Sequence, residues 1–270
     1  MSYQISALQT KSRKPTFQDI EKCNKVAEFI RATYDFGLWY RSKLRWENAV
    51  LVSMTDASHA NEEEWIDELE ILEPFRSQSG RLSLLCDASI LDGNAMTFHV
   101  LSFGSNKIAK VCRSTISCET YSMQMGEETT AVLRASFADL HGKLEPKCWE
   151  DSAASFVPML WLTDCFSAVT CLQRTVMAKV ADKRLGIELA SLRQSLWRSR
   201  EGGRHDPRVA DTRPHDATDV VRWIDTKVML CDCMTKDMDG AMLMRTIKDN
   251  EHSIAQPPES LEIESDCGVG

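Results

Sequence analysis

Short apolar runs and longer stretches of helical apolar spacing alternate along the chain. Five runs of this kind predict buried strands, at residues 49–55, 82–86, 96–101, 158–163 and 220–224. Apolar residues three or four positions apart predict helices at 16–35, 115–140, 166–176 and 185–196, with a short helix from about Asp239. A meander of three strands followed by alternating helices and strands predicts an α/β fold with a five-stranded mixed sheet flanked by helices.

Composition divides the chain into three parts. Residues 1–45 hold the first helix, and Thr16 with Asp19 three positions on is typical of a capping box. Residues 46–250 hold the strands and the remaining helices. Within them, residues 62–75 carry only acidic charges, and we expect an inserted acidic helix or loop there. Residues 251–270 lose all periodicity and predict a disordered acidic tail.

Composition also excludes several classes of protein. No apolar run approaches the roughly 20 residues that span a bilayer, and the N-terminal segment lacks the apolar core of a secretory signal. We therefore expect an intracellular protein, cytoplasmic or nuclear, with no membrane partner. Its ten cysteines are scattered, without the paired spacing of a structural zinc site, and we expect free thiols and no small-molecule cofactor. Oligomeric state is not indicated.

A formal net charge of −8 argues against a nucleic-acid partner, but the charge is unevenly distributed. Between residues 173 and 205 basic residues outnumber acidic ones. This stretch is the one candidate surface for phosphate groups. Its candidate contacts are Arg174, Lys179, Lys183, Arg184 and Arg193. An ordinary solvated helix face explains the same pattern, so both interpretations stay open.

Four acidic residues have the local settings of a metal site. Asp56 and Asp164 directly follow apolar runs, and sites in open α/β sheets gather beyond the carboxyl ends of strands. Glu119 falls in the first turns of the helix at 115–140, and Asp232 follows the last strand. One such residue is usually a cap or turn. Four together repel one another unless cations are present, and oxygen ligands favour Mg²⁺ or Mn²⁺.

Several segments carry short motifs in a fixed order. They are Met54-Thr55-Asp56-Ala57, Arg76-Ser77-Gln78-Ser79-Gly80, Ser114-Thr115-Ile116-Ser117-Cys118-Glu119, Asp164-Cys165-Phe166-Ser167-Ala168-Val169, Lys183-Arg184-Leu185-Gly186-Ile187 and Leu230-Cys231-Asp232-Cys233-Met234-Thr235-Lys236. The segments resemble the sDAD, RSTSG, SSTEAE, DNxSAI, KHIDI and LADxxTK motifs of the ribonuclease H domain in copia-type retrotransposon Pol polyproteins. The helix around residues 26–33 resembles the one that joins reverse transcriptase to that domain, so the resemblance covers about residues 16–245.

The resemblance implies a ribonuclease H-like fold and hydrolysis of the RNA strand in RNA/DNA hybrids. It implies that Asp56 bridges two divalent ions, Mg²⁺ or Mn²⁺. Glu119 and Asp164 would hold one ion and Asp232 the other. Two ions placed in this way activate water and stabilise the leaving oxygen of a phosphodiester.

The chain also departs from the family pattern. Ser58 stands where the sDAD motif has its second acidic residue, Ser117 stands where the SSTEAE motif has its first glutamate, and Gly186 replaces an aspartate of the KHIDI motif. No Tyr-x-Asp-Asp motif is present, so we expect a chain without the polymerase site: a fragment, a processed product or a separately encoded remnant.

Two other functions compete with the nuclease. The first is a decayed or repurposed element that keeps the fold and binds partners without catalysis, a hypothesis that the acidic charge favours. The second is a related nuclease or integrase on the same scaffold. Such enzymes use the order Asp, Asp, Glu, whereas the order Asp, Glu, Asp, Asp found here favours ribonuclease H.

Overall fold

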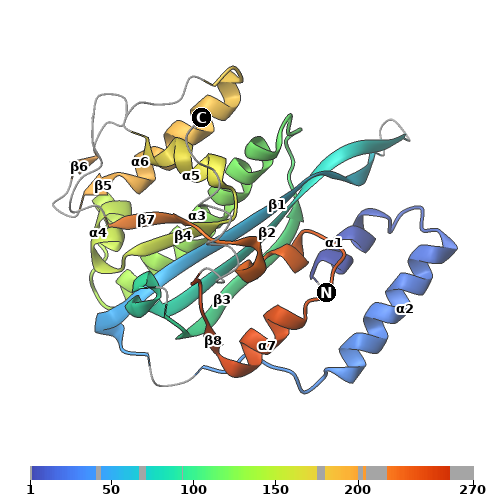
Figure 1. Ribbon diagram of the computed structural model, residues 1–270, viewed down its shortest axis with the longest axis horizontal. Coiled ribbons are helices and arrows are strands. Elements are labelled where there is room, and N and C mark those ends of the chain that lie inside the picture. The colour runs from blue at the N-terminus through green and yellow to red at the C-terminus, as the bar shows by residue number, and fades with distance from the viewer. Residues whose placement is uncertain are drawn as a thin grey trace, which may run out of the picture.

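A six-stranded mixed sheet with helices on both faces forms the body of the computed structural model (Figure 1). The structure describes residues 2–40, 44–66, 71–92, 94–174, 180–199, 203–204 and 218–255. The strand order is β7-β4-β1-β2-β3-β8. The strands are β1 (Ala49–Ile66), β2 (Ile71–Asp87), β3 (Met96–Lys107), β4 (Met159–Thr163), β7 (Asp219–Trp223) and β8 (Glu251–His252). A separate pair consists of β5 (Arg198–Ser199) and β6 (Gly203–Arg204).

Strand directions confirm the α/β class but not the number of strands. Strands β1, β2 and β3 form an antiparallel meander, and β4 and β7 run parallel to β1. The predicted count of five was wrong, because the two-residue strand β8 pairs with β3 through Met96 and Thr97. So short a strand has no apolar run of its own to predict it. Its residues begin the segment expected to be a disordered tail, of which residues 256–270 lie outside the described part.

The sequence predicted an inserted acidic helix or loop at residues 62–75, and this prediction was wrong. The described residues of this segment form the far end of a long β-hairpin. Strands β1 and β2 continue to pair here, with Glu62 opposite Arg76 and Ile66 opposite Ile71, after a register shift that follows Ser58. Figure 1 shows this hairpin extending past the rest of the sheet. Because glutamate is disfavoured in strands, the acidic composition did not indicate a strand here. Pairing between β1 and β2 stabilises the strand conformation nevertheless.

Alternation along the central strands builds two cores. One contains Val52, Met54 and Leu160 and is covered by α7 (Ala241–Asp249). The other contains Leu51, Trp161 and Leu189. It is covered by α3 (Thr115–Leu140), α4 (Trp149–Phe156), α5 (Phe166–Gln173) and α6 (Lys183–Leu196). Odd and even positions of a strand face opposite sides, so both faces of β1 and β4 are buried.

Helix α3 lies close against the sheet at Gly126. A Cβ atom there would lie 2.3 Å from Thr55 Cγ2 and 2.8 Å from Ser53 Oγ, so only glycine allows this separation. Two buried hydrogen bonds between hydroxyl groups connect α3 to β2. The oxygen–oxygen distance is 2.7 Å between Ser79 and Ser122 and 2.8 Å between Ser83 and Thr130. Small residues therefore set the height of α3 above β1 and β2.

The N-terminal helices lie at one side of the sheet. Helix α1 (Ser2–Thr10) had no counterpart in the predicted elements, whereas α2 (Phe17–Ala32) has the capping box expected of Thr16 and Asp19. The apolar positions of α2 are exposed rather than packed, with Ile20 at 51% and Ile30 at 52%. Figure 1 shows α2 at the periphery, outside α1. No helix in the described part of the chain has both the length and the apolar character to cross a bilayer.

Candidate metal centre

Strand register brings Asp56 and Asp164 together. Strand β4 runs parallel to β1 with Leu162 beside Met54, and two further residues along each chain lead to Asp164 and Asp56. Both carboxylates continue the faces of Met54 and Leu162, because side chains two positions apart share a face. The sequence predicted that both aspartates follow the ends of strands. Asp164 does follow the last residue of β4, whereas Asp56 lies inside β1.

Asp232 reaches the same place from a short 3₁₀ turn, η5 (Asp232–Met234). The turn packs on β2 at Gly80, which pairs with Asp56 across the ladder. A Cβ at Gly80 would lie 2.9 Å from both Met234 Cβ and Thr235 Cγ2. The glycine therefore leaves the space in which the turn brings Asp232 next to Asp56.

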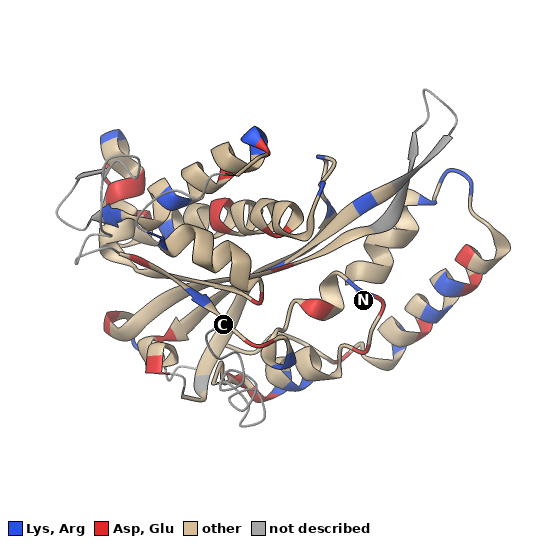
Figure 2. Ribbon diagram, turned by 45° about the horizontal axis from the view of Figure 1, so that its top comes forward, with Lys and Arg blue, Asp and Glu red and all other residues tan. Residues whose placement is uncertain are grey.

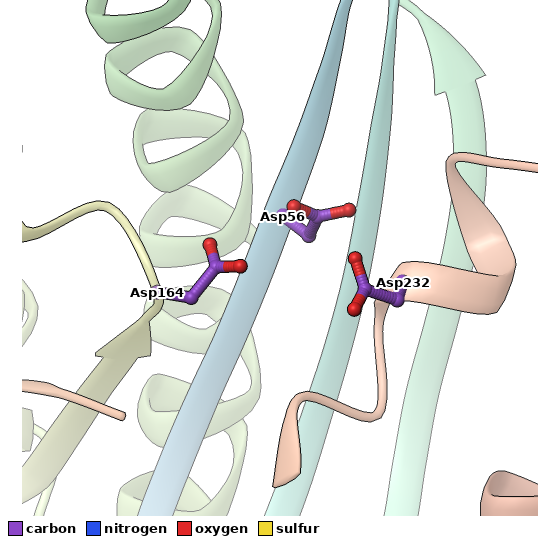
Figure 3. A group of neighbouring side chains, drawn as sticks. All are labelled: Asp56, Asp164 and Asp232. Atoms are coloured by element: carbon purple, nitrogen blue, oxygen red, sulfur yellow. The ribbon is translucent and has the colours of Figure 1, made fainter. Parts of the chain in front are cut away.

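Three of the four expected carboxylates converge. Ligand oxygens of Asp56, Asp164 and Asp232 all lie within 4.8 Å of one another, and Figure 3 shows Asp56 between the other two. Glu119, in the second turn of α3, stands beside this group rather than in it. Its Oε1 accepts a hydrogen bond from the Ala57 amide at 3.3 Å. Its Oε2 is buried and has no hydrogen-bond partner among the described residues.

The environment of these carboxylates favours their neutral forms. Burial, with the nearby charges of Asp56 and Asp232, raises the pKa of Asp164 to about 7. Burial and the charges of Asp56 and Asp164 raise the pKa of Glu119 well above its ordinary value. Burial likewise raises the pKa of Asp56, although hydrogen bonding to Thr235 and the charge of Lys236 oppose it. A bound cation would remove this penalty on the charged forms.

These shifts predict a pH dependence for the metal-free protein. The unfolded pKa of an aspartate is near 3.9, so between about pH 4 and pH 7 the folded chain binds more protons at Asp164 than the unfolded chain does. We expect the contribution of Asp164 to the free energy of unfolding to fall as pH rises through this window. Urea titrations in EDTA at pH 5 and pH 8 measure it. Asp164→Asn should flatten the difference, and an equally steep loss in that variant would contradict the expectation.

The residues present fit a hard divalent cation. All the converging donors are carboxylate oxygens, the ligands that Mg²⁺ and Mn²⁺ prefer. The Oε2 of Glu119, which has no hydrogen-bond partner in the described part of the chain, is a buried acceptor that a cation beside Asp56 and Asp164 would satisfy. Cysteine takes no part in the group, and the described cysteines are free thiols, as expected.

A buried amide that sequence reasoning missed connects the N-terminal helix to this site. Gln78 is 1% exposed, and its Nε2 donates to Ser6 Oγ in α1 at 3.0 Å and to Ser105 Oγ in β3 at 2.8 Å. Ser105 Oγ then donates to the Met234 carbonyl at 2.5 Å, in the turn that carries Asp232. Gln78 lies in the segment Arg76–Gly80 that drew attention in the sequence, but the partners of its side chain are distant in sequence and no local pattern indicates them.

Gln78→Leu is expected to weaken metal binding by about tenfold, since outer-shell partners of a metal site contribute 10- to 100-fold in affinity. The free energy of unfolding should fall by about 1–3 kcal/mol, because Ser6 and Ser105 lose a buried donor. Calorimetric titration with Mn²⁺ and urea unfolding measure the two effects. Gln194→Leu, on the exposed side of α6, is the control. Unchanged Mn²⁺ affinity in Gln78→Leu would show that the chain of hydrogen bonds does not position Asp232.

The expected phosphate-binding residues separate into two groups. Arg174, Lys183 and Arg184 are exposed, and Lys179 lies outside the described residues. Arg193 does not fit the expectation, because it is only 1% exposed and its guanidinium lies 3.9 Å from the centroid of the Trp197 ring. The helical apolar stripe of α6 carries Arg193 into the core. Figure 2 shows acidic and basic residues interspersed over the described helices.

Comparisons with protein-family models, curated proteins and solved structures give no match for this chain. The functional conclusion therefore depends on the geometry of the site, and no relative assigns the chain to a family.

Proposed function

We propose that this protein is a metal-dependent endonuclease that hydrolyses the RNA strand of RNA/DNA hybrids. One observation carries the proposal: Asp56, Asp164 and Asp232 converge beside a buried Glu119 oxygen that has no partner among the described residues. Four carboxylates gathered around one ammonium group, that of Lys236, carry excess negative charge, which is unfavourable in a fold that has no use for further cations. We also propose that the sheet is ribonuclease H-like. Its antiparallel meander followed by two parallel strands supports that assignment.

The protein's part in the reaction is to hold and orient charge. In this proposal Asp56, in the middle of the group, would serve two cation positions, one shared with Glu119 and Asp164 and the other shared with Asp232. Divalent ions, when bound there, supply Lewis-acid activation of water and stabilisation of the leaving oxygen. The rigid strands under Asp56 and Asp164 fix the two carboxylates in advance, so the site needs little reorganisation when substrate arrives.

The choice of an RNA/DNA hybrid comes from the sequence motifs. Exposed Arg174, Lys183 and Arg184 are available for phosphate contacts. With a net charge of −8 on the chain and few such contacts, binding should be weak, and because the salt dependence scales with the number of phosphate contacts, it should decrease only modestly with added salt.

Cleavage of a labelled RNA/DNA hybrid by the full chain in Mg²⁺ or Mn²⁺ tests the proposal. Duplex DNA, duplex RNA and single-stranded RNA of the same sequence serve as comparison substrates. We expect the hybrid's RNA strand to be cut, and Asp164→Asn to be inactive while Asp139→Asn, an exposed position on α3, keeps full activity. If the folded wild type showed no metal-dependent cleavage, the proposed nuclease activity would be overturned and a non-catalytic binding module would be favoured. Equal cleavage of all duplexes would overturn the hybrid specificity.

A further inference from the structure

The two sides of Asp56 differ in how their charge is compensated. On the side of Asp164, the Oε2 of Glu119 is buried and has no hydrogen-bond partner among the described residues. On the side of Asp232, the protein supplies its own donors. Thr235 Oγ donates to Asp56 Oδ2, and the ammonium group of Lys236 contacts both aspartates. Among the described residues, a positively charged side chain contacts the Asp232 side of Asp56, and no salt bridge reaches Asp164 or Glu119.

Lys236 reaches this position across one turn of chain from Asp232. Its Nζ lies 2.5 Å from Asp232 Oδ1 and 3.9 Å from Asp56 Oδ2. The lysine side chain is 44% exposed, whereas the Asp56 side chain is 2% exposed. The ammonium group thus enters the site from solvent and can leave by the same route without unfolding the turn.

We propose that the Lys236 ammonium occupies the cation position between Asp56 and Asp232, so that the site binds one divalent ion readily and a second only by displacing this lysine. The inference rests on the proposed metal site and adds an order of loading to it. The first ion binds where Asp56 and Asp164 converge, next to the buried Oε2 of Glu119. Lys236 is a positioning residue that competes with the second ion.

Charge balance explains the order. Four ionised carboxylates carry four negative charges. One divalent ion with the ammonium group supplies 2 + 1 = 3 positive charges, which the carboxylates accommodate. Two divalent ions supply four and balance the group without the lysine, but with it they would exceed the negative charge and repel Nζ. The second ion must therefore break the contacts of Nζ with Asp232 and Asp56.

Calorimetric titration of the full chain with Mn²⁺ alone tests the inference without depending on catalysis. For the wild type we expect one tighter and one weaker ion. Lys236→Met should strengthen binding of the second ion by about tenfold, a difference of about 1.4 kcal/mol, and leave the first ion nearly unchanged. Lys236→Arg keeps the positive charge and should resemble the wild type. Lys248→Met, an exposed lysine of α7, is the matched control.

The possible failures are distinguishable. If the folded wild type binds no Mn²⁺, the proposed metal site fails and this inference fails with it. If the wild type binds Mn²⁺ but Lys236→Met binds the second ion no more tightly, only the role of Lys236 is overturned. Lys236→Gln, which keeps a polar side chain, repeats the comparison if the methionine variant does not fold.

Discussion

Asp56→Asn is expected to abolish metal-dependent hydrolysis and, at the same time, to stabilise the metal-free protein. Asp56 is buried and lies between Asp164 and Asp232, so its carboxylate serves both proposed cation positions. Metal ions contribute several kcal/mol to stabilising such a transition state, so activity should fall by about 10³-fold. Without metal, the amide removes a carboxylate whose pKa burial raises, so the free energy of unfolding in EDTA should rise at pH values where that carboxylate would be charged.

Initial rates on the hybrid and urea unfolding in EDTA measure the two effects of Asp56→Asn. Asp139→Asn, with the same chemical change at an exposed site on α3, should alter neither quantity. Loss of activity together with loss of stability in EDTA would mean that Asp56 supports the fold and not a metal.

Gly126→Ala is expected to destabilise the fold by about 3 kcal/mol, at the upper end of the usual range for overpacking. The new methyl group would overlap with Thr55 Cγ2 and Ser53 Oγ on β1, so α3 must move away from the sheet. Glu119 lies on the same helix, and its hydrogen bond to the Ala57 amide depends on the height of α3. Mn²⁺ affinity should therefore fall along with the free energy of unfolding.

Gly186→Ala is the control for Gly126→Ala and is expected to raise the free energy of unfolding. Gly186 lies inside α6, and a Cβ there meets no atom within 4 Å. Alanine in an open helical position stabilises a helix by about 0.5–1 kcal/mol. If Gly126→Ala were as harmless as Gly186→Ala, close packing at Gly126 would not be what positions α3.

Apolar runs were enough to predict most of the sheet, because each strand of the core contains a short apolar run bounded by polar residues. Strands β4 and β7 match the runs at 158–163 and 220–224 closely. The far end of the β1–β2 hairpin was missed because its composition is acidic. Strand β8 was missed because two residues carry no pattern. Helix α2 was predicted correctly from its apolar spacing, but the apolar positions that predicted it are exposed and not packed.

The site was predictable as a set of residues but not as a geometry. Motif order identified Asp56, Glu119, Asp164 and Asp232, and three of them converge. The position of Asp56 inside β1 follows from its pairing with β2, which continues past the apolar run. The contacts of Gln78 and Lys236 depend on how η5 packs against β2 and β3, and helical periodicity could not indicate that Arg193 is buried.

A crystal of the full chain soaked in Mn²⁺, with data collected for anomalous scattering, tests the central claim most directly. The expected result is an anomalous peak within about 2.0–2.6 Å of carboxylate oxygens from Asp56 and Asp164. Glu119 should turn its free oxygen toward that peak. Anomalous peaks elsewhere on the surface, with the Asp56, Asp164 and Asp232 carboxylates unliganded at saturating Mn²⁺, would contradict the claim that these residues form a metal centre.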